Sequence, residues 1–178
     1  AKVRRSLKKT RRKNWYNPFG ASKFKAADYR DDKDKAIAVY NEKGYRNASI
    51  TKDTMRYVSR KKILLEMWVD EGDRFYFRDI DFVGNTKYSS DTLRSVLRIR
   101  KGEVYNKKLL DTRLYQNPSG VDISSLYMDR GYLSFYLDPV ERVQGDSIDL
   151  EIRIREGRQY RVRDVTISGN TKTFDHVV

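Results

Sequence analysis

The clearest pattern in the sequence is an alternation of apolar and polar residues near position 150. In "IDLEIRIRE" (148–156), Ile148, Leu150, Ile152 and Ile154 alternate with acidic residues and arginines. A period of two places the apolar residues on one face of a β-strand and the charged residues on the other. The segment therefore predicts a strand in a sheet that is buried on one face and in contact with water on the other.

A second alternating segment precedes this strand. Leu133, Phe135 and Leu137 occupy every second position, which predicts a strand from about Leu133 to Val143 with these three side chains pointing inward. The sequence "QGDS" (144–147) then supplies the turn residues of a tight hairpin. The two strands are therefore expected to pair with each other.

An earlier strand and a first helix are predicted upstream of the hairpin. The strand runs from about Phe75 to Val83 and ends at Gly84-Asn85, a pair that tolerates positive φ. Ser89 and Ser90 are candidate caps for the helix that follows, which buries apolar residues at helical spacing: Leu93, Val96 and Leu97.

A longer helical segment, 107–130, connects the first helix to the hairpin. It is interrupted at "NPSG" (117–120), has Ile123, Leu126 and Tyr127 on one face, and ends at Gly131. The predicted order is strand, helix, helix, strand, strand. The predicted fold class is α+β, with two helices packed on one face of a three-stranded mixed sheet.

The same order of motifs occurs twice. "ILLEMWVDEG" (63–72) aligns with "IDLEIRIREG" (148–157), "RDIDFVGNTK" (78–87) with "RDVTISGNTK" (163–172), and "YNEKGYRNASI" (40–50) with "YMDRGYLSFYL" (127–137). The first two pairs are offset by 85 residues and the third by 87. This regularity predicts a tandem repeat.

The repeat divides the chain into three parts. Residues 74–157 form a complete module, and residues 1–73 form a module that lacks its first strand. Residues 158–178 are the start of a further module. "GNTK" is interpreted as turn chemistry at the same joint in successive modules, with Gly-Asn for the reversal and Thr and Lys exposed on the loop.

Composition argues against enzymatic and metal chemistry. The 178 residues include no cysteine and one histidine, His176, so no zinc site, thiol nucleophile, cofactor or catalytic residue is expected. The carboxylate pairs Asp31-Asp32 and Asp70-Glu71 are interpreted as solvated salt-bridge partners. No "GxGxxG" or "GxxxxGK(S/T)" motif for phosphate binding occurs.

These residues together resemble the POTRA family, the module found in tandem in the periplasmic part of BamA-type outer-membrane assembly factors. The resemblance is carried by "FVGNTKYSSDTL", by the Tyr40–Tyr45 and Tyr127–Tyr132 helix ends, and by the strand-final Glu71-Gly72 and Glu156-Gly157. It implies a periplasmic, non-enzymatic scaffold that docks unfolded outer-membrane β-barrel proteins and accessory subunits. It also implies a membrane β-barrel C-terminal to these modules in the same protein.

In the family, the second strand of the module lies at an edge of the sheet. Pro139 fits this position, because proline is tolerated in strands mainly at edges. An open edge can accept an incoming strand through main-chain hydrogen bonds. The predicted client-binding segments are Leu133, Ser134, Phe135, Tyr136 and Leu137, with the equivalent Ala48, Ser49, Ile50 and Thr51. The alternative is that both segments are only structural, with their edges covered by the next module or a partner.

Charge leaves a second class of function open. The net charge is +13, of which residues 1–13 contribute +8 through Lys2, Arg4, Arg5, Lys8, Lys9, Arg11, Arg12 and Lys13. Basic residues interleaved with aromatics could bind nucleic acid, and the basic start could contact an anionic membrane surface. The recurrence of the aromatic residues at core positions favours a structural role for them, so no nucleic-acid partner is expected.

Overall fold

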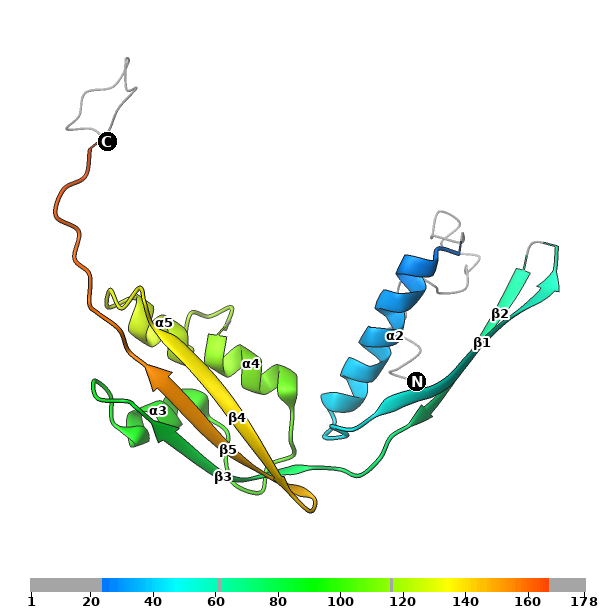
Figure 1. Ribbon diagram of the computed structural model, residues 1–178, viewed down its shortest axis with the longest axis horizontal. Helices are drawn as coiled ribbons and strands as arrows, with labels where there is room; N and C mark the ends of the chain where they lie inside the picture. Colours follow the sequence, from blue (N-terminus) through cyan, green and yellow to red (C-terminus); the bar gives the residue numbers. More distant parts are fainter. Residues whose placement is uncertain (1–23, 61, 116, 167–178) are drawn as a thin grey trace.

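The computed structural model describes residues 24–60, 62–115 and 117–166. The basic segment 1–13, His176 and the second "GNTK" therefore lie outside the described residues. The described chain contains a two-stranded sheet followed by a three-stranded sheet, joined by an extended connection (Figure 1).

The three-stranded sheet is mixed. It consists of β3 (Tyr76–Val83), β4 (Tyr136–Gln144) and β5 (Ser147–Arg155), in the order β3-β5-β4. The central strand β5 runs parallel to β3 and antiparallel to β4. Gly145, with φ of 61°, begins the two-residue turn of the β4–β5 hairpin. The predicted strand order along the chain is confirmed.

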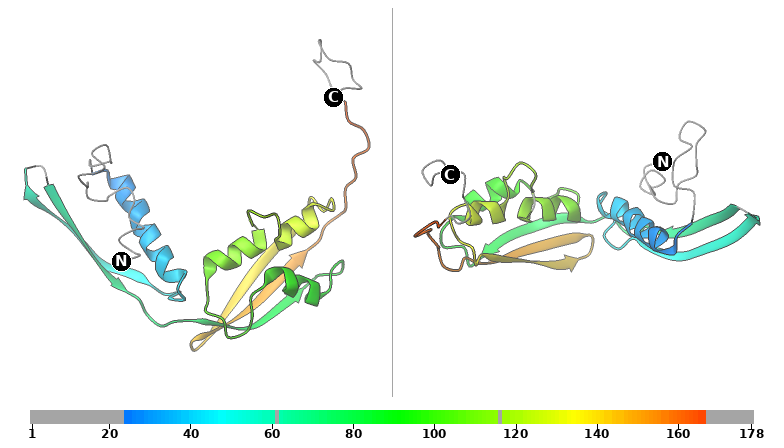
Figure 2. Two further views of the ribbon diagram at one scale, coloured as in Figure 1. Left: turned by 180° about the vertical axis from the view of Figure 1, so that it is seen from behind. Right: turned by 90° about the horizontal axis from the view of Figure 1, so that it is seen from above.

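The helices of this part lie on one face of the sheet (Figure 2). They are α3 (Ser90–Leu97), α4 (Lys107–Tyr115) and α5 (Ile123–Met128). Ser89 caps α3 by accepting a hydrogen bond from the Thr92 N–H, and Asp122 caps α5 in the same way through the Ser125 N–H. The second predicted helix is thus split into α4 and α5 at the interruption that the sequence predicts.

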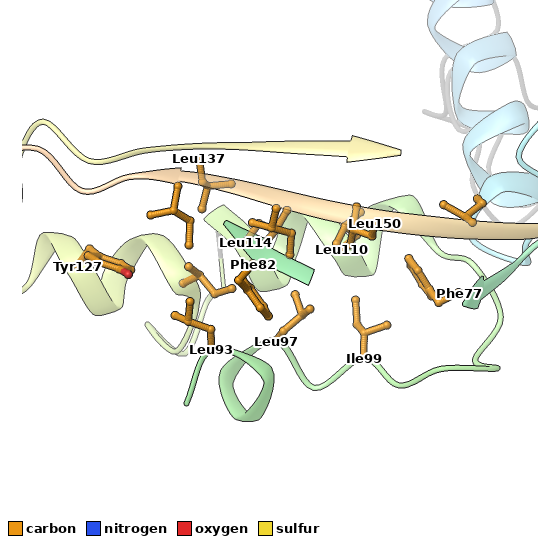
Figure 3. Packing of buried hydrophobic residues seen from close by; sticks show 14 of the residues in the cluster. Phe77, Phe82, Leu93, Leu97, Ile99, Leu110, Leu114, Tyr127, Leu137 and Leu150 are labelled. Atoms are coloured by element: carbon orange, nitrogen blue, oxygen red, sulfur yellow. The ribbon is translucent and has the colours of Figure 1, made fainter. Parts of the chain in front are cut away.

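The core fills the space between the helices and the sheet (Figure 3). The inward-facing residues of β5 are at most 5% exposed, as their alternation predicts: Ile148, Leu150, Ile152 and Ile154. They pack against Leu93 and Leu97 of α3, Leu110 and Leu114 of α4, and Ile123 and Tyr127 of α5. Burial of these side chains supplies most of the stabilisation of this part of the chain.

The opposite face of the sheet carries charge pairs instead of helices. Arg78 of β3 forms a two-point ion pair with Asp149 of β5, and Arg142 of β4 and Arg153 both bind Glu151. The Arg78 guanidinium holds the pKa of Asp149 below its ordinary value. This face remains in contact with water, as the sequence predicts.

The preceding part of the chain repeats the last elements of this arrangement. Helix α2 (Ala26–Asn41) is followed by the hairpin of β1 (Ser49–Ser59) and β2 (Lys62–Asp70). Ala36 of α2 is fully buried, at the position equivalent to Ile123 of α5. Helix α2, β1 and β2 therefore correspond to α5, β4 and β5.

Candidate functional site

The predicted client-binding edge is centred on β4, which lies at one edge of the three-stranded sheet. The strand begins at Tyr136, three residues later than the alternation of the sequence suggests. Leu133 and Ser134 lie in a turn, and the Phe135 N–H donates to the Tyr132 carbonyl at 3.0 Å. Leu133 is therefore not an inward-facing strand residue but is 66% exposed.

Phe135 is held by the core instead of the edge. It is buried, and its ring stacks on Tyr127 with the centroids 4.2 Å apart. Of the predicted segment, only Tyr136 and Leu137 belong to the strand. Client binding by Leu133, Ser134 and Phe135 would thus have to use a turn and a core residue.

The equivalent segment of the first hairpin is arranged in the same way. Ala48 is buried just before β1, and Ser49, Ile50 and Thr51 are the first residues of the strand. Thr51 donates its hydroxyl hydrogen to the Trp68 carbonyl of β2 at 3.3 Å. In the described residues β1 pairs with β2 alone, so this segment also lies at a sheet edge.

The main-chain groups that β4 presents outward follow from its register. Gln144 and Ser147 close the hairpin, and in an antiparallel pair the hydrogen-bonded positions then alternate along the strand. The peptide groups of Leu137, Pro139, Glu141 and Val143 consequently face away from β5. The Tyr115 hydroxyl donates to the Leu137 carbonyl at 3.1 Å, consistent with this direction.

The outward edge is therefore interrupted at its centre. Pro139 has no N–H, and Tyr115 already occupies the Leu137 carbonyl. Glu141 and Val143 present complete peptide groups, each with one donor and one acceptor. The half of β4 nearest the hairpin turn is thus the part best suited to pair with another strand.

The side chains around this half of β4 connect it to the first hairpin unit, which consists of α2, β1, β2 and the loop between α2 and β1. Glu141 accepts hydrogen bonds from Arg46 at 2.9 Å and from the Tyr105 hydroxyl at 2.6 Å. Burial and the Glu141 carboxylate raise the pKa of Tyr105 well above its ordinary value. The Val143 side chain in this half of β4 is 46% exposed.

A buried carboxylate, Glu156, joins the two repeated motifs "GNTK" and "EG". Its carboxylate accepts hydrogen bonds from the N–H groups of Thr86 and Lys87 at 2.7 and 2.8 Å, from the Thr86 hydroxyl, and from the Tyr127 hydroxyl at 3.0 Å. Burial alone would raise the pKa of Glu156, but these hydrogen bonds outweigh it and lower the pKa. The "GNTK" loop is therefore fixed to the end of β5, while Thr86 and Lys87 are exposed, as predicted.

The first hairpin unit preserves part of this arrangement. Tyr40 and Glu71 correspond to Tyr127 and Glu156, and burial together with Glu71 raises the pKa of the Tyr40 hydroxyl. The two motifs that meet in the three-stranded part of the chain, "GNTK" and "EG", are each visible as repeats in the sequence. The sequence does not predict their contact, because Thr86 and Glu156 are 70 residues apart.

Other candidate chemistry finds little support among the described residues. Asp32 is fully buried, with a carboxylate oxygen 3.6 Å from the Lys35 ammonium, so its interpretation as a solvated acid was wrong. Within residues 24–60, 62–115 and 117–166, no group of three or more potential ligands could hold a metal ion. No helix in the same ranges is both long and apolar enough to cross a membrane. Phe82, Tyr127 and Phe135 are buried and so do not form a stacking surface.

A family model identifies the three-stranded part of the chain. The model described as POTRA, surface antigen variable number repeat, matches residues 75–157. This segment is a POTRA domain. Its strand order along the chain and its helices on one sheet face are the features that the hydrophobic pattern predicts.

Relatives extend the similarity beyond the POTRA domain. The chain is 25% identical over 162 residues to the outer membrane protein assembly factor BamA of Neisseria meningitidis serogroup B, covering 89% of this chain and 20% of that protein. It is 26% identical over 144 residues to BamA of Neorickettsia risticii, covering 74% of this chain and 19% of that protein. The chain thus spans about a fifth of the length of the curated relatives it matches.

Solved structures support the fold. POTRA domains 3–5 of Haemophilus influenzae BamA match with a TM-score of 0.59 and 22% identity, covering 89% of this chain and 61% of that structure. Haemophilus ducreyi BamA lacking POTRA domains 1–3 matches with a TM-score of 0.58 and 16% identity, covering 81% of this chain and 27% of that structure. Both matches cover more of the chain than the POTRA domain alone.

Proposed function

We propose that this chain is part of a row of POTRA modules that serves outer-membrane protein assembly from the periplasm. The modules comprise residues 1–73, 74–157 and 158 onward, and they dock unfolded outer-membrane proteins and accessory subunits without catalysing a reaction. The family match over 75–157 and the BamA relatives support this role. The observation that carries the docking mechanism is the outward-facing main chain of β4.

In this proposal a client adds a strand to β4. The proposed docking surface consists of the outward peptide groups from Leu137 to Val143, with those of β1 from Ser49 onward as the equivalent surface. Strand addition recognises an extended main chain and tolerates varied side chains. That property suits a protein that handles many different unfolded clients. The predicted contributions of Leu133, Ser134, Phe135 and Ala48 remain predictions.

The outward groups of β4 predict weak binding. They offer N–H groups at Leu137, Glu141 and Val143, and carbonyls at Pro139, Glu141 and Val143. Six hydrogen bonds at about 1 kcal/mol net each would give about 6 kcal/mol. Association costs at least about 4 kcal/mol, so only about 2 kcal/mol remains before side-chain contacts are included. A client would be released readily.

Val143→Pro tests strand addition with little damage to the sheet. Val143 directs its N–H away from β5 and is 46% exposed, so proline removes an outward donor and leaves the β4–β5 ladder intact. The measurement is a titration of the 178-residue chain with an extended peptide of alternating apolar and polar residues, followed through the Glu141 amide signal, which the proline variant retains. Loss of about 1 kcal/mol should weaken peptide binding about fivefold.

Val143→Ala is the matched control, because it shortens the same side chain but keeps the N–H. It should bind the peptide within about twofold of the unmodified chain, since only a partly exposed contact is lost. Equal affinities of the proline and alanine variants would refute strand addition at this half of β4. Circular dichroism of both variants would confirm that the sheet is preserved.

A further inference from the structure

The joint between the first hairpin unit and the POTRA domain is made by main-chain hydrogen bonds. The Phe75 N–H, just before β3, donates to the Gly44 carbonyl at 2.8 Å. The neighbouring Arg74 side chain donates to the Lys43 carbonyl at 3.0 Å. Gly44 has φ of 97° and lies so close to Val104 that a Cβ atom would be 2.6 Å from its side chain. The chain leaving one module is thus held at the helix end of that module.

The same joint recurs at the far end of the POTRA domain. The Tyr160 N–H donates to the Gly131 carbonyl at 2.8 Å, and the Gln159 side chain donates to the Arg130 carbonyl at 2.8 Å. Gly131 has φ of 85°, and a Cβ atom there would be 2.4 Å from the Tyr160 carbonyl oxygen. Residues 158–160 therefore leave the POTRA domain as residues 73–75 leave the first unit.

The two joints correspond residue by residue. The glycines after β2 and β5 lie against equivalent residues: a Cβ atom on Gly72 would be 3.6 Å from Asn47, and one on Gly157 would be 2.9 Å from Ser134. The strands that follow the helix-end glycines Gly44 and Gly131 are β1 and β4. They begin at Ser49 and Tyr136, which are 87 positions apart, as the two glycines are. In this correspondence Leu133 occupies the position of Arg46.

Arg46 shows what this position does at the first joint. Its guanidinium binds Glu141 of β4 at 2.9 Å, so it reaches from the end of one unit onto the next. A second ion pair, between Lys108 and Glu42, crosses the same joint at 2.9 Å. The side chain two residues after the helix-end glycine is therefore a contact to the following module.

From this equivalence we infer that Leu133 is the docking contact for the module that begins at residue 158. The inference rests on the module organisation proposed above. Leu133 is 66% exposed although it is apolar, and residues 158–160 already lead the chain past it. The first joint is closed by charged side chains, whereas the second presents a leucine to its neighbour. This inference replaces the predicted role of Leu133 in client binding by a contact within the chain itself.

The absence of cysteine allows a direct test. A single thiol is introduced by Leu133→Cys, both in the 178-residue chain and in a longer version of the protein that includes the whole following module. The rate of reaction with a maleimide is then measured without client or peptide. Labelling should be about tenfold slower in the longer protein if the contact is formed about nine-tenths of the time.

Val143→Cys is the control, because Val143 belongs to the same domain, is 46% exposed and lies near the hairpin turn of β4, away from the second joint. Its labelling rate should be the same in both lengths. Equal rates for Leu133→Cys in the two proteins would overturn the inference. Protection that rises with protein concentration, or that requires added peptide, would also overturn it, by assigning the surface to a second copy or to a client. Failure of peptide docking at β4 would leave this measurement unaffected.

Discussion

Replacing Glu156 by alanine should destabilise the POTRA domain by about 3 kcal/mol. The Tyr127 side chain is fully buried, so its hydroxyl would lose a charged acceptor that water cannot easily replace, at a cost of about 2 kcal/mol. The Thr86 and Lys87 N–H groups are nearer to solvent and would be partly rehydrated, which adds about 1 kcal/mol. Glu156→Gln keeps an acceptor oxygen in place and should cost only about 1 kcal/mol.

Native-state hydrogen exchange of the β5 amides measures this loss in the POTRA domain alone. Unfolding of the first hairpin does not contribute to exchange in β5, because exchange reports local and subglobal stability. In addition, the Thr86 and Lys87 amides should lose protection in Glu156→Ala. Glu151→Ala provides the control, since Glu151 lies on the same strand and makes only surface ion pairs, worth about 0–1 kcal/mol.

The order of stability among the three variants tests the role of Glu156. The reasoning requires Glu156→Ala to be clearly less stable than both Glu156→Gln and Glu151→Ala. If Glu156→Ala cost no more than Glu151→Ala, the hydrogen bonds between "GNTK" and "EG" would be incidental. The two motifs would then have to be explained separately.

Three further expectations follow from described contacts. The folded pKa of Glu156 is lowered from its ordinary value of 4.5, so its contribution to folding stability is present above pH 4.5 and is lost as the pH falls through the folded pKa. The difference in unfolding free energy between the unmodified chain and Glu156→Gln should therefore disappear in urea titrations at acid pH. Gly131→Ala should expose the Tyr160 amide to exchange, whereas Gly145→Ala, which meets nothing within 4 Å, should incur only the cost of its positive φ, about 1 kcal/mol. Ser89→Ala should cost about 1 kcal/mol in β5 exchange by removing the cap of α3, and an unchanged rate would contradict that role.

The fold could be predicted because short-range patterns and long-range contacts agree. The alternation at Ile148, Leu150 and Ile152 fixes which face of β5 is buried, and the repeat then assigns the same elements to the first unit. Ser89 caps its helix as the local sequence suggests. In these segments the spacing of apolar residues is sufficient, since it depends only on the backbone period.

The details of the edge could not be predicted from the same patterns. Leu133 continues the alternation of Phe135 and Leu137, yet it lies in a turn, and β4 begins only at Tyr136. Residues 157–160 pack against this turn, a contact that no local pattern reveals. The occupation of the Leu137 carbonyl by Tyr115 depends on how α4 packs beside the strand. Such contacts join positions that have no common periodicity.

Pro139 has a consequence for molecules that do not carry a client. An exposed strand edge can pair with the identical edge of another molecule and so begin the growth of a continuous sheet. At β4, two copies that paired near their centres would both lack the Pro139 donor, and both would have the Leu137 carbonyl occupied by Tyr115. The interruption thus disfavours aggregation between like edges more strongly than it disfavours pairing with a regular strand, which supplies all of its own donors.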